Sequence, residues 1–127
     1  MLAIVVGMLV GMTVNMAIIE LNSRYLFPLP DGVDPTNIEQ LRSYIPDMPV
    51  GSALMVMVAH LSQALFGGAV AARLAASKPI MMAMWVGLFS MIGGISAFYM
   101  IGGPTWMLIE LPLYLVVAFG AGYFAAR

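Results

Sequence analysis

The chain has 127 residues, of which 62% are hydrophobic and only 9% are charged, whereas an ordinary soluble domain carries roughly 25% charged residues. The net charge of −1 and the absence of a basic cluster argue against nucleic acid as a partner, and the absence of cysteine excludes disulfides, thiolate metal sites and cysteine nucleophiles. So few charges cannot cover a water-facing surface, so the partner that composition predicts is the lipid bilayer.

Four stretches are apolar and long enough to cross the ~30 Å hydrocarbon core of a bilayer, which takes about 20 helical residues. They cover residues 2–23, 50–72, 80–101 and 104–126. Among the charged residues, only Glu20 and Glu110 lie inside them. We therefore predict an all-α membrane protein, a bundle of four transmembrane helices that forms one domain over residues 1–127. The first span has no basic segment before it and no small-residue cleavage site, so we expect it to be retained.

The loop at residues 24–49 is the only sizeable aqueous segment, and it opens with turn-forming prolines. Within the same loop, after these prolines, a short amphipathic helix is expected, with Asp34 as N-cap and Pro35 in the first helical position. Ile38, Leu41 and Ile45 then repeat at helical spacing. This helix could be a connector that lies on the membrane surface or a lid over an opening between the spans. The sequence leaves both interpretations open.

Basic residues predict the orientation of the spans. Arg73 and Lys78 lie in the loop on the same side as both termini, together with Arg127, whereas Arg24 and Arg42 lie on the other side. Because cytoplasmic loops carry an excess of Lys and Arg, we predict that both termini are cytoplasmic. The expected location is a bacterial inner membrane.

Small residues should let the helices approach closely, because lipid provides no hydrophobic drive between helices. The first three spans carry small residues on stripes that could face a neighbouring helix. The glycines predicted to pack between helices are Gly7, Gly11, Gly67, Gly87 and Gly94. Glycine faces left over after the bundle forms make a homo-oligomer, or assembly with other membrane subunits, plausible.

Polar residues inside the spans are expensive and need a partner or a purpose. At 1.5 Å per residue, Asn15, His60 and Glu110 all lie roughly 12–15 Å below the outer surface. Gln63 and Tyr114 lie about one turn away from this level, and Glu20 lies nearer the surface, one turn from Arg24. The predicted substrate-binding or ion-binding residues are Asn15, Glu20, His60, Gln63, Glu110 and Tyr114.

Two interpretations of this group remain open. A carboxyl group removed from water favours its neutral form and histidine titrates near neutral pH, so Glu110 and His60 could relay protons or bind a cation. Alternatively, His60, Glu110 and Asn15 satisfy one another in a structural network between helices. Met8, Met12 and Met16 form a stripe typical of ordinary apolar contact rather than a metal path. We predict no catalytic residue, metal site or cofactor and no enzymatic activity, since no catalytic motif is present.

The size and the layout of four spans are similar to those of small multidrug transporters and fluoride channels. Small multidrug transporters carry a glutamate near the middle of the first span, whereas Glu20 lies near its end. Fluoride channels carry a Phe/Thr/Ser run in the third span that residues 80–101 lack. No family is assigned. The leading hypothesis is an oligomeric transporter or channel subunit for protons, a cation or a small polar solute. The rival is a non-catalytic accessory subunit of a larger membrane complex.

Overall fold

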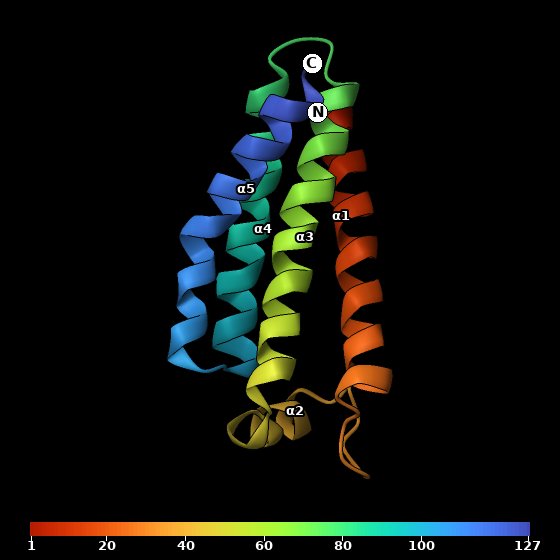
Figure 1. Cartoon of the computed structure of the whole chain (residues 1–127), viewed down its shortest axis with the longest axis vertical. Helices are drawn as coiled ribbons and strands as arrows, with labels where there is room; N and C mark the ends of the chain where they lie inside the picture. The colour runs from red at the N-terminus through yellow and green to blue at the C-terminus, as the bar shows by residue number, and fades with distance from the viewer.

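The computed structural model describes all residues 1–127 and contains helices but no strands (Figure 1). Four helices are long and apolar enough to cross a membrane, which confirms the predicted all-α bundle. They are α1 (Leu2–Leu21), α3 (Val50–Leu74), α4 (Pro79–Ile101) and α5 (Glu110–Ala125). A π-helical segment, Asn22–Leu26, continues α1 beyond the predicted end of the first span, and a 3₁₀ helix, Thr105–Ile109, leads into α5.

The helix α3 is the centre of the bundle. It packs against α1 on one side and against α4 and α5 on the other, and α4 and α5 also pack together. By contrast, α1 has α3 as its main neighbour and touches α4 only slightly. Both termini and the turn at 75–78 lie at one end of the bundle, which we call the terminal end (Figure 1). The segment at 27–49 lies across the opposite end, which we call the loop end.

The short helix of the first loop, α2, covers Ile38–Tyr44 and is followed by a 3₁₀ turn, Ile45–Asp47. The predicted N-cap was wrong: Asn37 caps α2, and its side-chain oxygen accepts a hydrogen bond from the backbone N–H of Gln40 at 3.1 Å. The carboxylate of Asp34 is engaged by Thr36 instead, whose backbone N–H and hydroxyl donate to it at 2.8 and 2.7 Å. These bonds favour the charged carboxylate and lower the pKa of Asp34. Asp34 therefore closes the turn before the helix.

Small residues dominate the contacts between helices in the half of the bundle nearer the terminal end. Ala71, Ala83 and Ala118 are completely buried. A Cβ atom built on Gly7 would lie 2.5 Å from the carbonyl oxygen of Gly67, and one built on Gly87 would lie 2.5 Å from the Cβ of Ala118. These separations leave no room for a side chain. The terminal half is therefore packed with little more than backbone and methyl groups between its helices.

Candidate functional site

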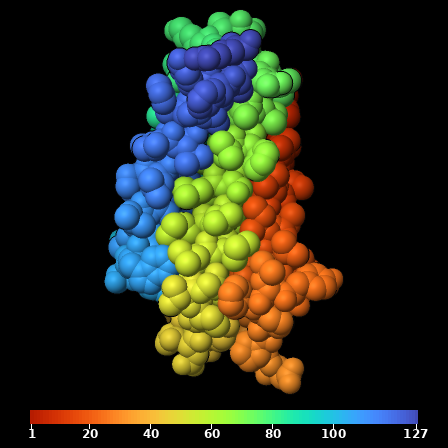
Figure 2. Space-filling view, viewed as in Figure 1, coloured from red at the N-terminus to blue at the C-terminus, as the bar shows by residue number.

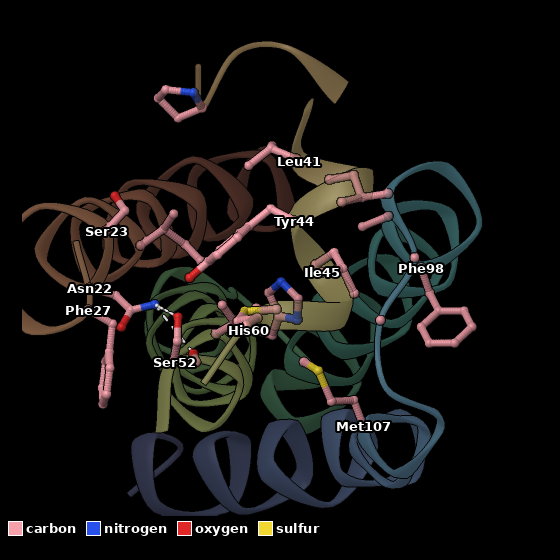
Figure 3. A pocket seen from close by; sticks show the side chains of 18 of the residues that line it. Asn22, Ser23, Phe27, Leu41, Tyr44, Ile45, Ser52, His60, Phe98 and Met107 are labelled. Atoms are coloured by element: carbon pink, nitrogen blue, oxygen red, sulfur yellow. Dashed lines mark hydrogen bonds between the residues drawn. The ribbon is translucent and has the colours of Figure 1, made fainter. Parts of the chain in front are cut away.

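A cavity of about 230 Å³ lies in the loop-end half of the bundle. Its walls come from the loop-end parts of α1, α3 and α4 and from the first residue of α5. Leu41, Tyr44 and Ile45 line it from α2 and the turn that follows (Figure 3). Segment 27–49 forms a thick layer over this end in the space-filling view (Figure 2). The short amphipathic helix is therefore the roof of a cavity.

Arg42 fixes this roof to the bundle. Its guanidinium group donates a hydrogen bond to the backbone carbonyl of Met100, close to the end of α4. That carbonyl belongs to the last turn of a helix, where no intrahelical N–H is left to bond to it. The contact therefore satisfies a free helix end and holds α2 above the cavity.

His60 and Glu110 form an ion pair or hydrogen bond at the floor of the cavity. The Nδ1 atom of His60 lies 3.0 Å from Oε1 of Glu110, and the side chains are only 19% and 7% exposed. His60 lies near the middle of α3, and Glu110 is the first residue of α5. Pro112 has no N–H to offer the carbonyl of Leu108, and the chain before Glu110 is wound as a 3₁₀ helix. The second carboxylate oxygen, Oε2, is buried and has no hydrogen-bond partner within the protein.

Tyr114 lies one turn after Glu110 and is 2% exposed. Its ring lies roughly parallel to that of His60, with the two centroids 6.5 Å apart. A Cβ atom on Gly94 would come within 2.6 Å of the Tyr114 hydroxyl. Gly94 therefore provides the space that lets this tyrosine lie behind the His60–Glu110 pair.

Asn15 belongs to a different group from His60 and Glu110. Its side-chain amide donates to Oε1 of Gln63 at 2.7 Å, and the amide of Gln63 donates to the hydroxyl of Ser90 at 3.2 Å. This chain of hydrogen bonds joins α1, α3 and α4. Gln63 follows His60 by three residues, which places the two side chains about 60° apart around α3. Gln63 therefore reaches α1 and α4, whereas His60 reaches α5.

A third polar contact lies at the rim of the cavity and was not predicted from the sequence. The side-chain amide of Asn22 donates to the hydroxyl of Ser52 at 3.1 Å (Figure 3). Ser52, Val56 and His60 follow one another at intervals of four residues and all line the cavity. That spacing places them on one face of α3, and it is the signal from which Ser52 could have been found.

Glu20 lies outside these groups. It pairs with Arg24, and both side chains are more than half exposed. The structure thus divides the predicted binding residues into three groups: His60 and Glu110 with Tyr114 at the cavity floor, Asn15 with Gln63, and Glu20 on the surface. Ser90, which bonds to Gln63, was not predicted. No group of three or more His, Asp or Glu side chains is placed to hold a metal ion.

The fold defines a small integral membrane protein, since four of its helices are suited to cross a bilayer. Comparisons of the chain with protein-family models, with curated proteins and with solved structures found no match. Arguments about its function therefore rest on the cavity and on the side chains around it.

Proposed function

We propose that this protein is a small proton-linked transporter or channel subunit in which His60 and Glu110 together bind the proton. The observation that carries the proposal is the buried His60–Glu110 contact at the floor of the cavity. An ionisable pair inside a membrane is costly and is typical of proton and ion pathways. Histidine changes its charge near neutral pH, and a carboxylate beside it offers a second place for the same proton.

The unequal packing of the two halves supports transport. The loop-end half holds the cavity among the helices, whereas in the terminal half Gly7 and Gly67 are in backbone contact and α5 packs closely on α4. The hollow between α3 and α5 that extends into the terminal half is an open surface groove. A cavity near one side of the membrane, with tight helix packing toward the other side, is the arrangement that alternating access requires of a single state. In this proposal the structure corresponds to a state in which the cavity lies nearer the loop end and is covered there by α2. Assembly as a homo-oligomer or with other membrane subunits is part of the same proposal.

The orientation in the membrane can be tested with single cysteines, because the chain has none of its own. Ser43 in α2 and Ser77 in the turn between α3 and α4 are both exposed, and they lie at opposite ends of the bundle. With the termini in the cytoplasm of a bacterial cell, Ser43→Cys should react with a membrane-impermeant maleimide in intact cells. Ser77→Cys should react only after the membrane is opened. The reverse labelling pattern would overturn the orientation.

The function itself is tested with purified protein in liposomes. After a pH jump, wild-type protein should release or take up protons faster than empty liposomes do. Glu110→Gln keeps the shape of the side chain and its ability to bond to His60 but removes the titratable carboxylate that shares the proton with His60, so we expect flux at the level of empty liposomes. His60→Asn should behave in the same way.

Glu20→Gln is the matched control, because it makes the same chemical change at an exposed glutamate outside the cavity. It should retain wild-type flux. Wild-type liposomes that cannot be distinguished from empty ones with protons, common cations and small polar solutes would contradict the transport proposal. An accessory role would then be favoured, above all if other chains co-purify in fixed ratio from native membranes.

A further inference from the structure

His60 presents a hydrogen-bonding atom to the cavity. Its Nδ1 atom is engaged by Glu110, and its Nε2 atom has no hydrogen-bond partner within the protein. The ring lines the cavity, and Figure 3 shows it below Tyr44 with one nitrogen directed toward the open space. Oε2 of Glu110 also has no partner, but it is fully buried, whereas Nε2 of His60 is not. The imidazole, rather than the carboxylate, is therefore the group that a ligand can reach.

The rest of the cavity suits a compact and mostly apolar molecule. Ile19, Val56, Ala97, Ile101 and Met107 are among the side chains that line it. A volume of about 230 Å³ is far more than a bare ion needs and lies just below the ~300–1,000 Å³ of pockets for drug-sized ligands. A charged ligand placed among these side chains would lose its hydration without gaining an ionic partner. The one carboxylate oxygen at the cavity without a hydrogen-bond partner, Oε2 of Glu110, is buried. The ligand should therefore be uncharged.

The contact between Nδ1 and Glu110 determines whether Nε2 of His60 accepts or donates a hydrogen bond. While Glu110 is ionised and His60 is neutral, the imidazole proton must lie on Nδ1, between that atom and Oε1, so Nε2 carries only a lone pair. When the pair takes up one proton, either the imidazole becomes doubly protonated or the carboxyl group donates to Nδ1. In both cases Nε2 carries a hydrogen. Proton uptake thus changes Nε2 from an acceptor into a donor, whichever residue holds the added proton.

On the basis of the proposed function, we propose that the cavity binds a small uncharged apolar molecule bearing a carbonyl oxygen, which accepts a hydrogen bond from Nε2–H of His60. Binding of such a molecule is coupled to the uptake of one proton by the His60–Glu110 pair. The coupling gives the transporter a way to link solute and proton, since the carbonyl compound is held tightly only by the protonated pair.

Few other titratable groups face this pair. Tyr114 lies behind it on α5, and Tyr44 lies above the cavity on α2. The residues that α1, its π-helical extension and α4 contribute to the cavity include none that titrates. The proton coupled to ligand binding is therefore assigned to His60 and Glu110.

The chain has a single histidine, so protein labelled with ¹⁵N-histidine reports on this imidazole alone by NMR in detergent micelles. Three compact probes of nearly equal shape separate the contributions: α-tetralone carries a carbonyl group, α-tetralol a hydroxyl group and tetralin neither. We expect α-tetralone to shift the Nε2 signal toward that of a protonated nitrogen. Its apparent dissociation constant should rise about tenfold per pH unit once the free pair has lost its proton. The hydroxyl of α-tetralol can donate or accept, so it should bind with much weaker dependence on pH.

Two variants keep the test decisive. Ala97→Leu adds bulk to the α4 wall of the cavity without altering His60 or Glu110. It should abolish the response to α-tetralone while leaving the histidine spectrum of the free protein unchanged. Glu110→Gln leaves neutral His60 able to place its proton on either nitrogen, because an amide can donate or accept, so α-tetralone should bind with little pH dependence above the histidine titration. An equal shift with tetralin, or no shift with α-tetralone, would overturn the proposal. These readouts do not depend on flux, so a binding site without transport and transport without this ligand class are told apart.

Discussion

Adding a single methyl group at Gly7 or at Gly67 is expected to separate α1 from α3 and to destabilise the protein by about 3 kcal/mol, the upper end of the usual range for overpacking. A Cβ atom on Gly7 would lie 2.5 Å from the carbonyl oxygen of Gly67, and one on Gly67 would lie 2.6 Å from the carbonyl oxygen of Gly7. Both obstacles are backbone atoms, which cannot turn aside as a flexible side chain could. Since α3 is the main neighbour of α1, separating the two helices removes most of the contacts that hold α1 in the bundle.

Gly93→Ala is the matched control for Gly7→Ala and Gly67→Ala. It makes the same change inside α4, where a Cβ atom would meet nothing within 4 Å. Alanine is preferred over glycine in a helix by about 1 kcal/mol, so this variant should melt at or above the wild-type temperature. The measurement is the midpoint of thermal unfolding in detergent for all three variants. Equal midpoints for Gly7→Ala and Gly93→Ala would show that the glycine contact does not hold α1 in place.

The four spans could be predicted because each is specified by its own composition. Length and hydropathy decide whether a segment crosses a bilayer, and neither depends on the rest of the fold. The ends were less accurate where a local hydrogen bond decides them. The first span continues as a π-helix to Leu26, and α2 begins after Asn37 rather than after Asp34, because Thr36 occupies the carboxylate of Asp34. Asparagine and aspartate are both good N-caps, so composition alone could not choose between them.

The depth of each polar residue in the membrane could be predicted from the sequence, but the neighbouring helix that its side chain faces could not. The constant rise of a helix placed His60 and Glu110 at one level, and the structure shows their side chains 3.0 Å apart. The same counting placed Asn15 with them, although it bonds to Gln63 on another side of α3. The sequence indicated that Gly7 and Gly67 lie between helices, but it did not show that they face each other, and this pairing decides which side of α3 faces α1.

The cavity could not be predicted from the spans alone, because part of its wall comes from the first loop. The sequence left open whether the short helix was a connector or a lid. In the structure Leu41 and Tyr44 face the cavity, and Arg42 bonds to the end of α4. The apolar face of a helix on a membrane surface can point into lipid or onto protein with the same residue pattern. Only the position of α4 decides between these two environments.

Removing the Glu110 side chain is expected to cost more stability than neutralising it. Glu110→Ala takes away the partner of His60 Nδ1 and leaves a hole beside the existing cavity. Hydrogen bonds between membrane helices average about 0.6 kcal/mol and reach about 1.7 kcal/mol, and the hole adds to this cost, so we expect a loss of about 2 kcal/mol. Glu110→Gln fills the same space and can still bond to the imidazole, so its cost should stay well below that of Glu110→Ala.

A double-mutant cycle separates the contact from the hole. If the 3.0 Å contact between His60 and Glu110 stabilises the bundle, then Glu110→Ala and His60→Ala together should cost less than the sum of the two single changes, with a coupling of about 1 kcal/mol. Glu20→Ala with Arg24→Ala provides the control cycle. That pair is more than half exposed, and such pairs contribute little. The readout is the midpoint of unfolding in detergent for each variant, at a pH where wild-type protein is stable. A coupling near zero for His60 and Glu110 would mean that the pair does not hold the helices together, and its burial would then have to be explained by function alone.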